Sequence, residues 1–594
     1  MSNIPDVALA IAKPYLAELL VWLSDQTYTE LLKRDPDHLL IKLSQHLNFG
    51  PLETACATYH HATGPGVTPI HPVPRLVRAL VVGSLYHWSL RELEWHIRFN
   101  LVVKWFVGYP IFALGPDHST LERFELWVCF KQHRAYFDEI LYQIDADFPD
   151  QRQAVQIGDT YALCANAAKE SLVQLIRHTC RRLLAALRKA DAARERTVQT
   201  QLDLTALWGA KDELSQFHLT PAERARRLQR TVLAAQDCIR RVRRQLDEPT
   251  ALMTAPRTTV LEWLTYLEKI IADEVCVVRL SVDPTGEAVL PPPVSTANAS
   301  DPSALPASSP SPNKEPSGAF QLHVTRRATH PKGSYRIGSA TDPEATYRVH
   351  GSDKLDFGYN VNVAVTDHFV REVHTDTGAQ PDAVAIPDML RDEAEYHHSV
   401  PPKFIYDSAA GAGKTRARVT AATNGQTQLV AHLSPSPPTE RFTPDRFRLL
   451  ADGKTLVCPH GQTTPIAYRS SRDEGLNFRF LAVHCRDCPL WTQCRTQKPG
   501  SKEIRYVYVS DYRGEVEAAQ VYNQSADFLA DMRHRPLVER IIAALVRYNG
   551  ARSARRRGTF RCDFQAKMNA MAYNLKKWMH LLRSPEASGL TRVT

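Results

Sequence analysis

Long apolar runs are missing from the sequence, although 43% of its 594 residues are hydrophobic. No stretch reaches the roughly 18 apolar residues that a membrane-spanning helix needs. The N-terminus also lacks the basic region and apolar core of a secretory signal. We therefore expect a soluble chain that is not exported and has no membrane partner. We also find no internal repeats.

Cysteine is scarce as well. The chain has 11 cysteines, an odd number in so long a sequence, and this argues against a disulfide framework. Charged residues make up 23%, which together with the hydrophobic fraction is close to the globular average and excludes general disorder. At roughly 150 residues per domain, the length predicts about four units.

Acidic residues are few at the C-terminal end. The whole sequence has 73 Lys and Arg against 64 Asp and Glu, a formal net charge of +9. Residues 531–594 hold 14 basic and 4 acidic residues, so this segment carries +10 and the rest of the chain −1. A basic segment on a near-neutral body predicts a polyanionic partner, with nucleic acid favoured over an anionic membrane.

Local patterns predict where helices and strands begin. Capping-box spacings at Ser89–Glu92 and Ser119–Glu122 predict two helix starts. Apolar alternation predicts strands in four places, at 154–161, Tyr359–Val365, Phe369–His374 and Lys403–Asp407.

These patterns divide the chain into seven segments of an α+β or α/β protein. Nine of the 39 prolines lie in residues 284–316, a composition typical of a linker. The predicted segments are a helical N-terminal domain (1–150), a first strand (151–165), a helical insertion (166–280), a Pro- and Ser-rich linker (281–318), central strands (319–430), a cysteine-rich insertion (431–510) and basic C-terminal helices (511–594).

Three carboxylates stand out for their local setting. Asp159 and Asp407 each end a predicted strand, and Glu539 lies in a basic predicted helix. Carboxylates at the carboxyl ends of neighbouring strands face the crevice in which open sheets bind ligands. Three such groups could hold two Mg²⁺ ions for phosphoryl transfer. The alternative is structural, because Asp is a common turn residue and Glu often forms ion pairs along a helix.

The order of several segments resembles that of the DDE transposases of bacterial insertion sequences, in the branch that carries a four-cysteine insertion. The blocks that carry this resemblance are Pro74–Leu80 with Ser89–Glu94 and Asp117–Phe124, then Gly158–Thr160, then Phe357–Asn360, and finally Phe404–Gly411. In this resemblance Asp159 and Asp407 match the first and second catalytic aspartates.

The third acid is matched through the family's C-terminal signature. Arg535 stands four residues before Glu539, as the signature requires, but Met532 and Val546 occupy the positions of its Tyr and Lys. Arg547, one residue beyond Val546, lies near the Glu539 face of a helix and could take over the phosphate contact.

The resemblance implies an RNase H-like catalytic domain that is interrupted by the helical and the zinc-ribbon-like insertions. Asp159, Asp407 and Glu539 would bind two Mg²⁺ or Mn²⁺ ions, nick DNA at element ends and join the 3′ hydroxyl to target DNA. It also implies a homodimer on DNA and a bacterial cytoplasmic, nucleoid-associated location. A plain metal-dependent nuclease and a non-catalytic, zinc-containing DNA-binding relative remain as alternatives.

The cysteine group predicts a structural zinc site. Cys485 and Cys488 have the spacing of a zinc knuckle, and Cys494 and Cys458 supply two further soft ligands. His460 or His484 could compete for a ligand position. A redox pair is the alternative, but a thioredoxin-like context is not apparent around the motif.

Two further motifs concern phosphate. Gly411–Thr415 resembles a P-loop, but Ser408 stands where the first glycine belongs, so we expect no nucleotide binding. A Gly- and Ser-containing basic loop after Glu539 predicts salt-dependent DNA contacts. The predicted DNA-binding residues are Arg535, Arg547, Arg552, Arg555, Arg556, Arg557 and Arg561.

Overall fold

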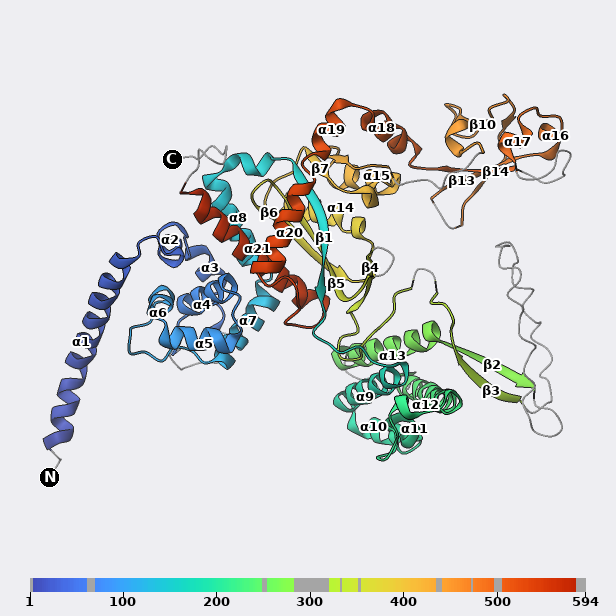
Figure 1. Cartoon of the computed structure of the whole chain (residues 1–594). Helices are drawn as coiled ribbons and strands as arrows, with labels where there is room; N and C mark the ends of the chain where they lie inside the picture. The colour runs from blue at the N-terminus through green and yellow to red at the C-terminus, as the bar shows by residue number, and fades with distance from the viewer. Residues whose placement is uncertain are drawn as a thin grey trace. The chain divides into compact units, whose positions relative to one another are not determined.

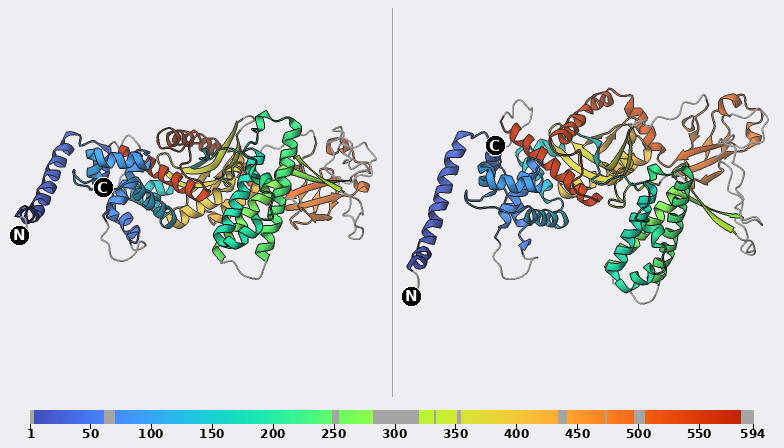
Figure 2. Two further views of the ribbon diagram at one scale, coloured as in Figure 1. Left: turned by 90° about the horizontal axis from the view of Figure 1, so that it is seen from below. Right: turned by 60° about the horizontal axis from the view of Figure 1, so that its bottom comes forward.

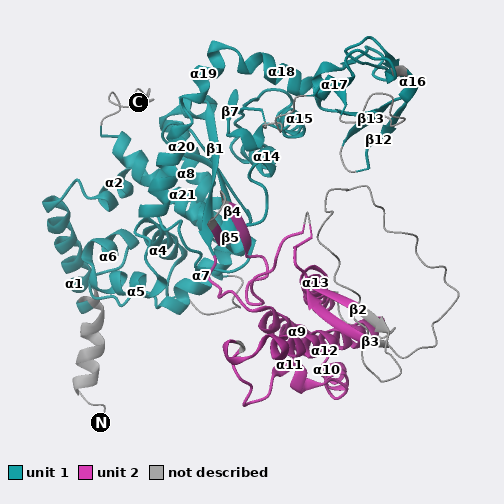
Figure 3. Ribbon diagram, turned by 45° about the vertical axis from the view of Figure 1, so that its right-hand side comes forward, with its two compact units in different colours: residues 1–164, 359–594 teal, residues 165–358 magenta. Residues whose placement is uncertain are grey.

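The protein is described by a computed structural model of the whole chain (Figure 1). The structure describes residues 4–60, 70–247, 254–281, 320–331, 334–350, 354–433, 441–471, 474–495 and 505–583. It divides into two compact units, residues 1–164 with 359–594 and residues 165–358 (Figure 3). The Pro- and Ser-rich linker predicted for 281–318 lies almost entirely outside the described residues.

The N-terminal part of the first unit is helical, as the sequence predicted. Its helices are α1 (Ile4–Arg34), α2 (Leu39–His46), α3 (Gly50–Ala55), α4 (Val73–Leu85), α5 (Leu90–Phe99), α6 (Leu101–Val107), α7 (His118–Lys131) and α8 (Ala135–Asp147). No helix among the described residues is both long and apolar enough to cross a membrane.

One of the two predicted capping boxes is confirmed. The Ser89 hydroxyl accepts a bond from Glu92 N at 3.3 Å, and the Glu92 carboxylate accepts one from Ser89 N at 2.7 Å. The box predicted at Ser119 is wrong, because α7 starts earlier and Asp117 is its N-cap, accepting a bond from Thr120 N at 2.8 Å. A carboxylate two residues upstream competes successfully for the free amides of the first turn.

A six-stranded mixed sheet forms the centre of the fold. Its strands are β1 (Gln156–Cys164), β4 (Thr346–His350), β5 (Lys354–Val365), β6 (Val370–Thr377), β7 (Lys403–Ile405) and β8 (Gln428–Val430). The order is β4-β5-β1-β7-β8, and β6 also pairs with β5, along Tyr359–Val365. β1, β7 and β8 run parallel, whereas β4 and β6 run antiparallel to β5.

The strands lie close to the predicted positions, with one difference that matters for the site. Asp159 does not end its strand, because β1 continues to Cys164 with Tyr161 and Leu163 buried. The neighbouring strand β7 is shorter: Ile157 pairs with Ile405, where β7 ends. Asp159 therefore lies beyond the end of β7, near the level of Asp407.

Helices of the first unit pack against the central sheet. α14 (Ile386–Tyr396) and α21 (Thr559–Leu581) pack against β6, and α20 (Pro536–Tyr548) packs against β1. α15 (Gly413–Ala422) follows β7, and α18 (Arg513–Asn523) and α19 (Ala526–Met532) precede α20.

A buried ion network ties these layers together. Arg371 on β6 is fully buried and bonds Asp145 on α8 at 2.5 Å and Glu393 on α14 at 3.3 Å. Gln156 at the start of β1 donates to the same Glu393 carboxylate at 2.7 Å. β1 is thus anchored at its start to the helical layers.

The second unit consists of a helical bundle and a hairpin. Its helices are α9 (Leu172–Ala190), α10 (Ala192–Gln199), α11 (Leu204–Trp208), α12 (Pro221–Asp247) and α13 (Thr254–Glu274), followed by the hairpin β2 (Val275–Ser281) and β3 (Phe320–Arg326). α9, α12 and α13 lie side by side (Figure 2) and bury Leu183, Val232 and Leu267 between them.

The cysteine-bearing residues fold into two small antiparallel sheets. One consists of β9 (Arg448–Leu449), β10 (Leu456–Val457) and β11 (Thr463–Thr464), and the other of β12 (Ala467–Arg469), β13 (Gly475–Phe480) and β14 (Arg505–Ser510). Phe447, Phe478 and Phe480 form their common core.

Replacing Arg371 with Met should destabilise the first unit strongly. The variant would leave Asp145 and Glu393 buried without their cation, which typically costs about 3–5 kcal/mol. Arg391→Met is the matched control, since Arg391 pairs with Asp388 at the surface of α14 and its side chain is 61% exposed, where such pairs contribute about 1 kcal/mol or less. Urea denaturation followed by tryptophan fluorescence measures both, and equal losses would contradict this account.

Candidate active site

The two predicted aspartates come from neighbouring parallel strands. Asp159 lies on β1, and Asp407 follows β7 by two residues and caps the short turn that comes next, accepting a bond from Ala409 N at 2.9 Å. Asp159 accepts a bond from Thr160 N at 2.8 Å. Gly158 precedes Asp159 because the Phe404 ring lies over the strand there, and a Cβ on Gly158 would come within 2.6 Å of it.

One guanidinium connects all three predicted acids. Arg535 Nη2 lies 3.2 Å from Asp159 Oδ2 and 3.8 Å from Asp407 Oδ2, and Arg535 Nη1 lies 3.4 Å from Glu539 Oε1. Asp159 Oδ2 and Asp407 Oδ2 both lie close to Arg535 Nη2. The distance between these two oxygens therefore cannot exceed the sum of their distances to that nitrogen. Carboxylates that share two metal ions need this closeness, because such ions lie about 3.5–4 Å apart.

The three acids differ in exposure. The side chain of Asp159 is 19% exposed, that of Asp407 40% and that of Glu539 66%, while the side chain of Arg535 is 19% exposed. Asp159 is therefore the inner wall of the site. Glu539, in the first turn of α20, stands at its rim.

The surroundings of Asp159 disfavour the negative charge on its carboxylate. Burial raises the pKa of Asp159, and the negative charges of Asp407 and Asp382 raise it further, whereas Arg535 and the Thr160 amide act in the opposite direction. The net effect is a pKa above the ordinary value of an aspartate. A cation that reaches the site relieves this penalty.

Asp382 is a nearby acid that the sequence did not single out as a site residue. It lies in the 3₁₀ turn Asp382–Val384 after β6, accepts a bond from Asn360 Nδ2 at 2.7 Å, and its charge acts on Asp159. An acid in a Pro-initiated turn a few residues after a strand is the signal that could have found it.

Metal-binding geometry is not preformed. Among the described residues, the structure has no group of three His, Cys, Asp or Glu side chains that are placed to hold a metal ion. Asp159, Asp407 and Glu539 instead share the positive charge of the Arg535 guanidinium.

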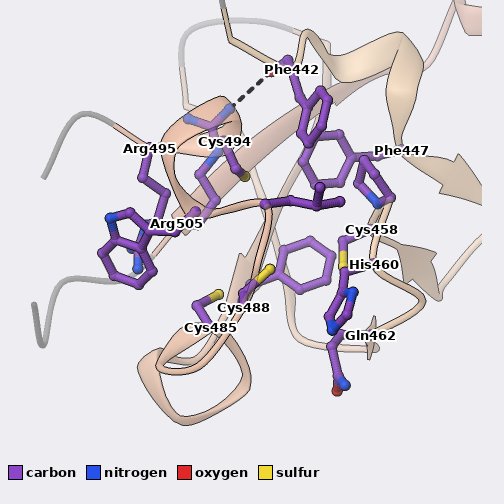
Figure 4. A pocket seen from close by; sticks show the side chains of 14 residues that line it. Phe442, Phe447, Cys458, His460, Gln462, Cys485, Cys488, Cys494, Arg495 and Arg505 are labelled. Atoms are coloured by element: carbon purple, nitrogen blue, oxygen red, sulfur yellow. Dashed lines mark hydrogen bonds between the residues drawn. The ribbon is translucent and has the colours of Figure 1, made fainter. Parts of the chain in front are cut away.

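The four predicted zinc ligands line one cavity (Figure 4). Cys458 follows β10 in a tight turn, in which Gly461 N bonds Cys458 O at 2.9 Å. Cys485 ends α16 (Ala482–Cys485), Cys488 N bonds Cys485 O at 3.2 Å, and Cys494 ends α17 (Trp491–Cys494). Burial raises the pKa of Cys485 and Cys494, and the neighbouring cysteines raise both further. His460 lines the same cavity.

Several arginines of the basic loop have partners within the first unit. Arg555 donates to the carbonyls of His87 and Trp88, Arg556 pairs with Glu122 and Glu125, and the Arg561 guanidinium lies 5.3 Å from the centre of the Phe130 ring. These contacts fasten the loop to the N-terminal helices. The Arg547 and Arg552 side chains are exposed to solvent.

The P-loop-like stretch is engaged in another contact. Lys414, in the first turn of α15, pairs with Glu474 at 2.5 Å, just before β13. Its charge is therefore directed at a protein carboxylate.

Comparison with protein families gives two matches. Residues 457–579 match the family described as "Transposase DDE domain", and residues 29–125 match the family described as "Transposase domain (DUF772)". The first match includes the cysteine group, Arg535, Glu539 and the basic loop, and the second extends from the end of α1 into α7. No curated protein and no solved structure matches the chain.

Replacing Asp159 with Asn should raise the melting temperature of the metal-free protein at pH 7. Because the pKa of Asp159 is raised in the folded state, its protonated form stabilises the fold below the ordinary aspartate pKa, and this contribution is lost as the pH rises through the raised value. The neutral amide avoids that loss, so the difference from wild type should shrink as the pH falls.

Thermal unfolding in EDTA from pH 7 downward measures this difference. Asp367→Asn, in the exposed turn between β5 and β6, is the control and should have little effect. A lower melting temperature for Asp159→Asn at pH 7 would be inconsistent with the assigned electrostatics.

Proposed function

We propose that this chain, a DDE transposase that cleaves DNA and transfers the cut strands, holds its divalent metal ions on Asp159, Asp407 and Glu539. The observation that carries the proposal is their shared partner, since all three pair with the Arg535 guanidinium at 3.2, 3.8 and 3.4 Å. Carboxylate oxygens are the ligands that Mg²⁺ and Mn²⁺ prefer. The acids that gather around this cation therefore fit those ions in their chemistry.

We infer further that the mixed sheet is the RNase H-like core that a DDE family implies. In support, β1 lies between β5 and β7, and the three acids come from β1, the end of β7 and a helix that packs on β1. The helices α9 to α13 and the β2–β3 hairpin interrupt this core between β1 and β4, and the cysteine-bearing sheets interrupt it after β8.

The chain's own residues prepare the site for phosphoryl transfer. Two divalent ions, when bound, lower the pKa of a water or of a DNA end hydroxyl and stabilise the leaving 3′ oxygen. Asp159 and Asp407 are fixed by backbone amides at 2.8 and 2.9 Å. Once the carboxylates are neutralised, Arg535 no longer has to balance them, and its planar fork can pair with a DNA phosphate.

DNA is the substrate both as the element end that is cut and as the target to which the end is joined. Phosphate contacts from Arg547, Arg552, Arg557 and Arg561 would give salt-dependent affinity without sequence preference. We propose a homodimer on DNA, because joining an element requires both of its ends to be held together.

Asp159→Asn and Asp407→Asn should each reduce Mg²⁺- or Mn²⁺-dependent strand cleavage by more than about 100-fold, because even an outer residue of a metal site contributes up to that factor. Folding and DNA binding should survive. Cleavage of end-bearing DNA and formation of joined products are measured on gels, with Asp367→Asn as the exposed control.

Each outcome discriminates between candidate activities. Joined strand-transfer products distinguish a transposase from a plain nuclease. Wild-type protein that binds DNA but never cleaves it would favour a non-catalytic relative. Undiminished cleavage by either variant would exclude the proposed metal ligands.

We propose a structural zinc ion in the cysteine cavity. Cys458, Cys485, Cys488 and Cys494 line the cavity together, and four thiolates select zinc over magnesium. Zinc there would supply a crosslink for two sheets whose common core is small. With all four positions filled by protein ligands, the ion would stabilise the fold and not take part in catalysis.

The purified protein should contain one zinc per chain, and Cys485→Ser with Cys488→Ser should remove it, because thiolates supply the binding energy. Elemental analysis measures the metal, and trypsin cleavage within residues 441–510 reports the fold. Cys276→Ser, on the β2 strand of the other unit, is the control. Zinc-free protein with an equally protected segment would contradict the proposal.

A further inference from the structure

The second unit has a cleft that the proposed active site does not use. The cleft has a volume of about 630 Å³, within the range of ligand-binding clefts. Its walls are the start of α9, the loop between α11 and α12, the first turns of α12 and the end of β3. All of these elements lie within residues 165–358.

Cationic side chains dominate the cleft. Arg177, Arg224, Arg227 and Arg326 line it, against the two acids Glu170 and Glu213. Glu213 is shared by two of the arginines: it bonds Arg177 at 2.9 Å and pairs with Arg227 at 3.2 Å. The bond from Arg177, followed by the charges of Arg227 and Arg230, lowers the pKa of Glu213. The positive charge of the cleft thus exceeds what its acids balance.

Arg326 pairs with Glu274 outside the cleft at 3.5 Å, so the excess charge of the cleft rests on Arg224 and Arg227. Arg224 donates its Nε to the Leu219 carbonyl at 3.0 Å, a neutral partner. The Glu170 carboxylate accepts bonds from the Ser339 hydroxyl and from Ala340 N, both at 3.4 Å, and it lies 3.2 Å from His178 Nδ1. Arg224 and Arg227 therefore bring charge to the cleft that an anionic ligand could neutralise.

The cationic wall is built into the fold. Arg177 is 4% exposed, and it is held in place by the bidentate pair with Glu213. Gly209 after α11 has a φ of +80°, and a Cβ there would lie 2.5 Å from the Glu213 carboxylate and 2.8 Å from Arg177. Only glycine allows the chain to turn this closely past the ion pair.

Apolar side chains stand beside these arginines. The loop buries Leu219 but leaves Phe217 80% and Leu214 59% exposed, and all three line the cleft. An aromatic ring at the mouth of a cationic cleft is the arrangement by which proteins bind unpaired nucleotides: bases stack on the ring, and basic groups follow the backbone phosphates.

We propose that this cleft binds a single DNA strand, with Phe217 stacked on an unpaired base and Arg224 and Arg227 on the adjacent phosphates. A strand of this kind is exposed whenever a DNA end is frayed or cut, so the cleft would hold DNA that the enzyme handles. The inference rests on the chain's acting on DNA and is independent of which acids bind the metal.

The test measures the binding of labelled 20-nucleotide single-stranded and duplex DNA by fluorescence anisotropy, with full-length protein in EDTA. Arg224→Ala with Arg227→Ala should weaken single-strand binding about tenfold or more. It should also lower the slope of log affinity against log salt by about 1.4, at about 0.7 per lost phosphate contact. Phe217→Ala should weaken it about five- to a hundredfold, as loss of one base stack does, with an unchanged slope.

Matched controls separate the cleft from general electrostatics. Arg240→Ala with Arg244→Ala removes the same charge from exposed positions at the other end of α12. Tyr142→Ala removes an aromatic side chain that is 72% exposed on α8. Both should change single-strand affinity by less than about twofold. The two arginines are exposed charges outside the cleft, which salt largely screens, and Tyr142 does not line the cleft.

A direct measurement does not depend on the folding of variants. Wild-type protein is irradiated with a strand that contains 4-thiothymidine, and the crosslinked peptide is identified by mass spectrometry. A crosslink within residues 209–228 supports the proposal.

Three results would overturn the proposal. The first is an equal loss of single-strand affinity in the cleft and control variants. The second is cleft variants that lose duplex binding but keep single-strand binding. The third is a crosslink map without residues 209–228. Because these assays contain no metal, they can succeed when Asp159 and Asp407 prove not to be catalytic, and they can fail while cleavage persists.

Discussion

Three carboxylates around one guanidinium are the interaction on which the rest of the site depends. Acids that share a few ångströms of space repel one another and take up protons unless a cation lies between them. Arg535 supplies that cation from the start of α20, a helix that packs on the strand carrying Asp159. The folded protein can therefore hold these acids together in the absence of a metal ion, as the proposed metal site requires.

The remaining parts of the first unit serve to keep this group rigid. β1 is held at its start by the bond from Gln156 to Glu393, and Arg371 joins that glutamate to Asp145 on α8. The short β7 ends before the level of Asp159, so the two aspartates meet where the parallel pairing stops. Arg535 itself lies at the start of α20 and outside the sheet, so the proposed exchange of its partners would not require the strands to move.

Local signals predicted the elements well, and long-range pairs not at all. Alternating residues located β5 and β6, and the box at Ser89 is present, while the one at Ser119 gave way to a cap at Asp117, two residues earlier. The sequence placed Arg535 as the signature residue four positions before Glu539 and as a DNA contact. It did not predict the pairing with Asp159, which joins residues 376 positions apart. The Arg177–Glu213 pair was missed for the same reason, because proximity through the fold leaves no spacing to read. Asp382 was not assigned to the site, although its Pro-initiated turn is a local signal.

The central claim is that Asp159, Asp407 and Glu539 exchange Arg535 for divalent ions. The most direct measurement is anomalous diffraction from crystals of the protein grown with Mn²⁺ and end-bearing DNA, since it locates the metal without reference to activity. The account predicts manganese peaks between the three carboxylates, with the Arg535 guanidinium moved away from them toward a DNA phosphate. Manganese bound elsewhere, or Arg535 still paired with Asp159 in the loaded complex, would contradict it.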